Sequence, residues 1–173
     1  MIPDIEVQLQ AVIKSLKDNV LPAIDAENAL AQQQIQLSLA TLGIALEHMP
    51  LVHSVARKDI ESHVALSKEI LERDIGPDSG TELKKAVATA ESALCDPALG
   101  FVQLQQQARR LRAAVGQVIA FHADSDSAEE VEKLVLSASK ISLDMGRAWN
   151  KAMGFEPNPD AVKELATQLK TSQ

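Results

Sequence analysis

The residues of this chain with the clearest capacity for chemistry are three arginines in one short stretch, Arg109, Arg110 and Arg112. On a helix, Arg109 and Arg112 share a face at a spacing of i and i+3. A guanidinium holds a phosphate or a carboxylate through two parallel hydrogen bonds, so this face is a candidate anion site. The simpler alternative, which we favour, is a solvated face whose arginines pair with acidic side chains on neighbouring helices.

A second cationic group lies nearer the end of the chain. Arg147 and Lys151 are spaced i and i+4, one helical turn apart, with Trp149 between them. Two cations with an aromatic ring as a platform are a candidate site for an anionic ligand. The alternative is that Trp149 anchors a core or an interface, which is the more common role of a lone tryptophan.

Four histidines, His48, His53, His63 and His122, raise the question of a metal site. Helical bundles that hold two metal ions use a Glu-x-x-His pair on each of two helices, and that spacing occurs nowhere in the sequence. His63 and Asp59 share a helix face at i and i−4, but an ion pair between them is the simpler explanation. We therefore predict no metal site and no cofactor.

The sequence carries no pattern for catalysis. Cys95 is expected near a helix C-terminus and is followed by Asp96, and both features disfavour a reactive thiolate. There is no Gly-x-Ser-x-Gly elbow, no Walker loop and no dinucleotide fingerprint. The acidic residues Glu129, Glu130 and Glu132 fall in the expected first turn of a helix, where the helix dipole favours them. We predict no catalytic residue, which argues against an enzyme.

Composition limits the class of protein further. The 173 residues suffice for one domain with its own core. Apolar residues make up 46% of the chain, yet tyrosine is absent and tryptophan occurs once, so the core must consist of Leu, Ile, Val and Ala. The net charge of −7 argues against a nucleic-acid partner, because a phosphate backbone calls for clustered Lys and Arg.

The start of the chain and its apolar runs predict a soluble, cytoplasmic protein. Residues Met1 to Glu6 carry acid where a signal peptide would have a basic segment. No uninterrupted apolar run approaches the ~20 residues that span a bilayer. The single cysteine cannot form an internal disulfide.

Apolar residues recur every three to four positions, and no stretch alternates with a period of two. This pattern predicts an all-α fold, a six- to seven-helix bundle in a single domain over residues 1–173. The second helix carries two apolar stripes and should be covered on two sides. The strongest loop signal is at 75–80, and Ser79 with Glu82 and Ser127 with Glu130 have capping-box spacing. The expected helices cover about 4–20, 25–49, 51–73, 79–95, 98–123, 127–154 and 158–170.

Two of these helices have clear core faces. The fifth carries a continuous apolar stripe at helical spacing, and the sixth carries a broader one. The predicted core residues are Leu104, Ala108, Leu111, Val115 and Val118 on the fifth helix, and Val131, Leu134, Val135, Ala138, Ile141 and Met145 on the sixth.

Landmark residues recur in the same order in the two halves of the chain. Two prolines, Pro22 and Pro97, two glutamine clusters and two mid-helix glycines, Gly43 and Gly116, recur at an offset of about 75 residues. This order predicts an internal repeat of two three-helix units, 4–76 and 79–154, with the tail helix outside it. The alternative is that helices rich in Ala, Leu and Gln align by composition alone.

The run from Val12 to Ala23, Val-Ile-Lys-Ser-Leu-Lys-Asp-Asn-Val-Leu-Pro-Ala, and the following Asn28-Ala29-Leu30 carry a resemblance. They resemble the opening of a family of small all-helical bacterial proteins of unknown function. Members are typically encoded next to acyl-CoA dehydrogenases and aminoglycoside-phosphotransferase-like kinases. The resemblance covers about the first 40 residues. It implies an accessory role in acyl-CoA or lipid-related metabolism and supplies no catalytic residue.

Two functions remain open. The first, favoured by the missing motifs and the doubled architecture, is a non-catalytic helical interaction, assembly or accessory protein that forms a homodimer or binds a partner protein. The second is a helical-bundle module that holds a small anionic or acyl, CoA-like ligand. Its candidate ligand-binding residues are Arg109, Arg112, Arg147, Trp149 and Lys151.

Overall fold

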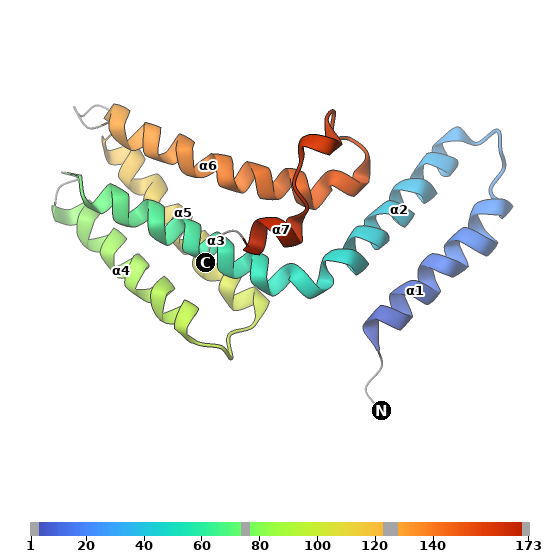
Figure 1. Cartoon of the computed structure of the whole chain (residues 1–173), viewed down its shortest axis with the longest axis horizontal. Helices are drawn as coiled ribbons and strands as arrows, with labels where there is room; N and C mark the ends of the chain where they lie inside the picture. Colours follow the sequence, from blue (N-terminus) through green and yellow to red (C-terminus); the bar gives the residue numbers. More distant parts are fainter. Residues whose placement is uncertain (1–3, 74–76, 123–127, 171–173) are drawn as a thin grey trace. The chain divides into compact units, whose positions relative to one another are not determined.

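The computed structural model describes residues 4–73, 77–122 and 128–170. All regular structure in these ranges is helical, which confirms the prediction of an all-α fold. The described helices, α1 to α7, are joined by loops and by short 3-10 and π turns (Figure 1). The chain divides into two compact units.

Unit 1 consists of Met1–Pro50 and Gly146–Leu165, and unit 2 consists of Leu51–Met145 and Ala166–Gln173. These boundaries differ from the junction at 76–80 that the internal repeat predicts. A compact unit can combine segments from both copies of a repeat, so the duplication stays a prediction.

Two antiparallel helices, α1 (Ile5–Ser15) and α2 (Ala29–His48), pack on each other in unit 1. Asp4 caps α1 as predicted, because its carboxylate accepts the backbone N–H groups of Glu6 and Val7. The segment after α1 continues through a π turn and a 3-10 turn that contains Pro22. Regular α geometry thus ends at Ser15, before the proline, and Pro22 lies in the first turn of the short 3-10 segment, where its missing N–H needs no partner.

The start of α2 lies later than predicted. Asn28 caps this helix, its side-chain oxygen accepting the backbone N–H of Ala31. Asp25, the predicted start, instead accepts the backbone N–H of Glu27 within the connecting turn. Ile35 and Ile44, nine positions apart and thus on opposite sides of α2, are both buried. The prediction that this helix is covered on two sides is confirmed at these positions.

The predicted tail helix over 158–170 is wrong in its first half. A 3-10 turn, Pro159–Ala161, is followed by extended backbone at Val162, and only α7 (Leu165–Lys170) is α-helical. Val162 is buried, and its carbonyl accepts a hydrogen bond from Lys151 Nζ at 3.2 Å. The burial of the Val162 side chain and the hydrogen bond to its carbonyl favour extended backbone here over a continuous helix. The predicted stop at Gly154 is confirmed, since this residue has the left-handed φ of 78°.

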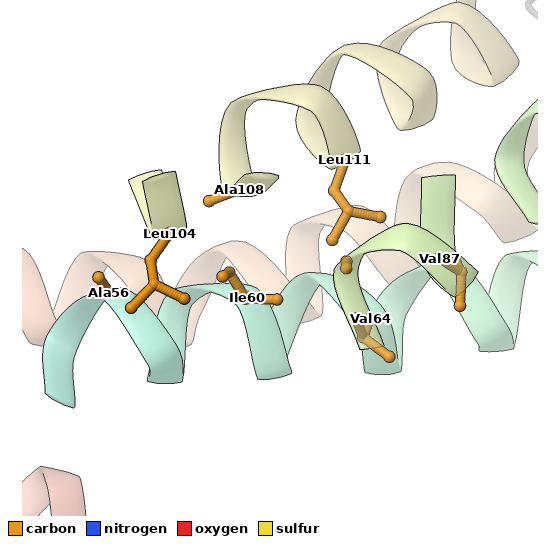
Figure 2. Close-up of a cluster of buried hydrophobic side chains, with 8 residues drawn as sticks. Ala56, Ile60, Val64, Val87, Leu104, Ala108 and Leu111 are labelled. Atoms are coloured by element: carbon orange, nitrogen blue, oxygen red, sulfur yellow. The ribbon is translucent and has the colours of Figure 1, made fainter. Parts of the chain in front are cut away.

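Unit 2 is built on three mutually packed helices, α3 (Val52–Leu71), α4 (Pro77–Cys95) and α5 (Phe101–His122). Their apolar faces converge on one cluster of buried side chains, which Figure 2 draws as sticks. Full burial of a Leu or Ile side chain contributes about 1.5–3 kcal/mol, so this cluster is a main source of stability. Its residues are Ala56, Ile60, Val64, Val87, Ala90, Leu104, Ala108 and Leu111.

The predicted stripe of α5 is confirmed, because all five of its residues are buried. α6 (Ala128–Asn150) begins in unit 2, where Val131 belongs to a second cluster with Leu66 and Val115. Ile141, predicted to pack in the core, is 47% exposed, so that prediction is wrong. Its position on the helix turns it away from the face that Val131 and Ala138 share.

Two side chains of α3 hold the connection between α4 and α5. Arg57 donates through Nη2 to the carbonyl of Leu94 at 2.5 Å, and His53 Nε2 lies 3.1 Å from the carbonyl of Leu99. Carbonyl groups at a helix C-terminus have no partner within the helix, and a cation there also complements the helix dipole.

The predicted loop at 75–80 is wrong from Pro77 onward, since α4 begins at that residue. Proline suits a first helical turn because its missing N–H has no partner there. Ser79 therefore lies inside the helix and is not its N-cap. Ser127, predicted to cap the sixth helix, lies outside the described residues.

One helical run in the described residues, Ala29–Leu71, is long and apolar enough by length and composition to cross a membrane. A core helix of a soluble protein passes the same test, so the run carries little weight. The expectation of a protein without a membrane span stays a prediction.

Candidate functional site

A cavity of about 220 Å³ opens in unit 2 where α3, α5 and α6 meet. Its lining has two parts. The apolar part consists of Leu66, Val115, Ile119, Val135 and Ala138, and the polar part consists of Ser62, His63, Arg112, Ser139 and Ser142, with Gly116 beside them. Leu66 and Val115 are buried and form the floor, whereas Arg112, Ser139 and Ser142 are exposed at the mouth.

Helical spacing places these residues on the facing sides of their helices. Arg112, Val115, Gly116 and Ile119 recur at three- and four-residue steps along α5, so they share one face. The space beside Gly116 is open, because a Cβ added there would meet no atom within 4 Å. A larger residue at this position would reach into the cavity.

Asp59 on α3 and Arg112 on α5 form an ion pair at the edge of the cavity. Nη1 of Arg112 donates to both carboxylate oxygens of Asp59, at 2.9 and 3.2 Å. The side chain of Asp59 is 22% exposed and that of Arg112 is 47% exposed. Because the contact uses Nη1 alone, Nε and Nη2 of the guanidinium remain available as donors.

His63 is held from one side of its ring by the same aspartate. Its Nδ1 lies 2.7 Å from the backbone carbonyl of Asp59 and 3.2 Å from a carboxylate oxygen of that residue. A carbonyl oxygen only accepts, so Nδ1 carries the hydrogen and donates it. In the neutral ring, Nε2 is therefore the nitrogen with a free lone pair.

Charge and burial shift the pKa values of His63 and Asp59 in opposite directions. Burial alone would lower the pKa of His63, but the hydrogen bonds and the negative charge of Asp59 outweigh it and raise that pKa. Burial would likewise raise the pKa of Asp59, but His63 and Arg112 together hold that pKa below its ordinary value. Asp59 thus stabilises the protonated imidazole.

Of the five predicted ligand-binding residues, Arg112 lines this cavity. Arg112 pairs with Asp59 on a neighbouring helix. This contact is the one expected if the arginines belong to a solvated face paired with acidic side chains. Arg109 is exposed one turn from Arg112 and has no ion-pair partner among the described residues. Arg110 lines a separate groove between α4 and α5, together with Glu82 and Lys85.

The other three predicted residues belong to unit 1. Arg147 donates through Nε and Nη2 to the two carboxylate oxygens of Glu156, at 3.0 and 2.8 Å. This contact holds the pKa of Glu156 below its ordinary value. Lys151 Nζ lies 2.6 Å from a carboxylate oxygen of Glu164. Both cations are thus engaged with carboxylates of the same chain, which weakens the case for an anion site here.

Trp149 packs against a histidine. Its ring centroid lies 4.6 Å from that of His48, which is 4% exposed. The contact supports the alternative in which the tryptophan anchors packing rather than a ligand.

No known family model, no protein of curated function and no solved structure matches this chain. The geometry of the cavity is therefore the basis for any assignment. Within the described residues, no group of three or more His, Cys, Asp or Glu side chains is placed to hold a metal ion. No described serine hydroxyl is hydrogen-bonded to His63, so the arrangement can bind a ligand and exchange a proton but holds no activated nucleophile.

Sequence reasoning identified Arg112 and the Asp59–His63 spacing but missed how they combine. It also missed the cavity-lining serines Ser62, Ser139 and Ser142. The signal that was available is Gly116, a helix-interior glycine in a stretch of good helix formers, since such a glycine costs about 1 kcal/mol relative to alanine.

Proposed function

We propose that the protein is a helical-bundle module that binds a small amphipathic anion in the cavity between α3, α5 and α6. The observation that carries the proposal is the division of the cavity into an apolar floor and a polar edge with unused donors. Ligand sites in proteins are typically concave and apolar with a few convergent polar groups.

The cavity volume limits the ligand. A water molecule occupies ~30 Å³ in the liquid, so about 220 Å³ corresponds to roughly seven non-hydrogen atoms, which accommodates a six-carbon tail whose head group lies at the open edge beside Arg112. A short apolar tail with an anionic head fits this space, whereas a whole CoA ester does not. The resemblance of the first residues to proteins encoded beside acyl-CoA dehydrogenases is compatible with such a ligand.

The proposal is tested with hexanoate, hexyl phosphate and hexylamine, three compounds with one tail and different heads. In thermal unfolding, either anion should stabilise the protein and the amine should not. A ligand at ten times its Kd stabilises by about 1.4 kcal/mol. If neither anion stabilises the wild-type protein, the proposal is wrong.

Gly116→Leu is the decisive variant. Leucine fills open space and replaces a helix-interior glycine, which favours the helix by about 0.8–1 kcal/mol. We expect a folded protein, at least as stable as wild type without ligand, that hexanoate no longer stabilises. Gly43→Leu is the matched control, because Gly43 is also a mid-helix glycine with open space but lies in unit 1. Stabilisation of Gly116→Leu equal to that of wild type would contradict this location.

A second candidate function is self-association through α1. This helix has no buried residue, and it carries the large apolar side chains Ile5 and Val12, which lie seven positions apart on one face and are 60% and 47% exposed. Exposed apolar side chains that share a face commonly mark an interface. Sedimentation velocity over a range of concentrations should detect a dimer that Val12→Lys dissociates, with Val102→Lys on α5 as the control. A monomer at every concentration would eliminate this candidate.

A further inference from the structure

We infer that the ligand of this cavity is a monocarboxylate and that its binding transfers one solvent proton to Nε2 of His63. This inference rests on the proposed function and specifies the ligand class and the charge change at the same site.

The inference follows from the charges around the cavity. Arg112 contributes one positive charge and Asp59 one negative charge, so with neutral His63 their sum is zero. The residues that α6 contributes to the lining, Val135, Ala138, Ser139 and Ser142, are uncharged, and α4 contributes no lining residue. Arg109 is exposed and does not line the cavity. A monoanion above an apolar floor is therefore neutralised only when the site gains one positive charge.

His63 is the group that can supply this charge. Asp59 is the titratable side chain that contacts it. The positive charge of Arg112, which lines the same cavity, opposes protonation of His63, but the hydrogen bonds and the negative charge of Asp59 outweigh it. Since Nδ1 already donates to the carbonyl of Asp59, the incoming proton adds to Nε2. The ligand stays a carboxylate with its own bonds intact, the protonated buffer gives up the proton, and the new N–H donates to a ligand oxygen. The raised pKa of His63 makes this proton uptake accessible near neutral pH.

The donors match the two oxygens of a carboxylate. One oxygen accepts from His63 Nε2, and the other accepts from the nitrogens of Arg112 that Asp59 leaves unused. A dianionic phosphate would retain one negative charge without a partner, which is costly beside an apolar wall. The site is thus expected to prefer hexanoate to hexyl phosphate.

Calorimetry on the full-length protein measures the proton directly. Hexanoate is titrated at about pH 8 in HEPES and in Tris, which differ in ionisation enthalpy, so the difference in heat gives the protons taken up. We expect an uptake of up to about 0.5 proton per ligand in wild type, the most that a rise of one unit in the pKa of His63 allows. His63→Gln should reduce the uptake to near zero and weaken binding about tenfold, while His53→Gln, altered outside the cavity, should behave as wild type.

A second measurement uses the wild-type protein and therefore does not depend on correct folding of the variant. In NMR titrations of the wild-type imidazole, saturating hexanoate should raise the pH midpoint of His63 by about one unit, which corresponds to a tenfold coupling. Three results would overturn the inference. Hexanoate could bind without proton uptake, the uptake could be unchanged in His63→Gln, or hexanoate could bind more weakly than hexyl phosphate. In each of these cases the proposed function stands. Failure of both hexyl anions to bind would instead refute the proposed function itself.

Discussion

Arg112 on α5 donates from a single nitrogen to both carboxylate oxygens of Asp59 on α3, at 2.9 and 3.2 Å. The two residues are 53 positions apart in the chain, and their contact joins two helices at the edge of the cavity. Asp59 also contacts His63, so one carboxylate positions both the imidazole and the guanidinium that line the cavity.

This ion pair should contribute measurably to stability. Arg112→Ala leaves a largely buried carboxylate with one partner fewer, and because Arg112 is itself half-exposed we expect a loss of about 1 kcal/mol in urea unfolding. Arg109→Ala is the matched control and should change stability little, since that side chain is exposed and has no ion-pair partner among the described residues. Equal effects of the two variants would show that the pair contributes nothing.

Stability should depend on pH through His63. Its folded pKa lies above the ordinary histidine value of 6.5, so the protonated form adds stability that is complete below pH 6.5 and is lost as pH rises through the folded pKa. His63→Gln should therefore cost more stability at about pH 5.5 than at about pH 8.5. The same substitution in an Asp59→Asn background should lose this dependence, because the carboxylate that raises the pKa is gone. A pH-independent cost in the wild-type background would contradict the assignment.

Asp59 should act in the opposite pH direction. Its folded pKa lies below 3.8, so its contribution is complete above about pH 4 and is lost as pH falls through the folded value. Comparison of wild type with Asp59→Asn in acid denaturation measures this term. The difference in unfolding free energy should shrink as the pH decreases below 4. A difference that stays constant down to pH 2 would be evidence against it.

Ser67 should be a site of easy stabilisation. The residue is 0% exposed, and its hydroxyl has no hydrogen-bond partner in the part of the chain that the structure describes. A buried polar group without a partner costs about 1–3 kcal/mol, so Ser67→Ala should raise the free energy of unfolding by about 1 kcal/mol or more. Ser139→Ala is the control, because that hydroxyl is bonded to the carbonyl of Val135 and the side chain is exposed. Both substitutions change helix propensity equally. The amount by which Ser67→Ala stabilises more than Ser139→Ala therefore measures the cost of the buried hydroxyl.

His48 offers a similar test with a spectroscopic reading. Its Nδ1 is buried and has no hydrogen-bond partner among residues 4–73, 77–122 and 128–170. Its ring packs on Trp149, the single tryptophan of the chain. His48→Phe keeps the ring contact and removes the unpaired nitrogen, so we expect a gain of about 1 kcal/mol. The Trp149 emission maximum should stay in place, whereas in His48→Ala it should move to longer wavelength. Loss of stability in His48→Phe would mean that Nδ1 has a partner in solution.

The helices were the predictable part of the fold. The apolar spacing along α5 places Leu104 and Leu111 on one face, and both are fully buried. The least predictable parts were element ends and the tail, where tertiary contacts compete with local preference. Val162 illustrates this, because its burial and the bond from Lys151 replace the expected helix with extended backbone.

The partners of the charged residues could not be predicted from the sequence. In the sequence, Arg112 and Arg147 were both candidates to bind an anion. Arg112 instead pairs with Asp59, 53 positions away, and Arg147 pairs with Glu156, nine positions away. Helical periodicity assigns a residue to a face of its own helix, but it does not say which faces meet.

The sequence by itself determined that this chain is all-α, which residues of α5 form its core face, and that Asp59 and His63 share one side of a helix. These are properties of a single helix, set by a period of 3.6 residues. Only the tertiary structure decided that Arg112 reaches Asp59 and that Gly116 borders a cavity with His63. The reason is that three helices distant in the chain build that cavity, and their packing is set by the whole core rather than by any one segment.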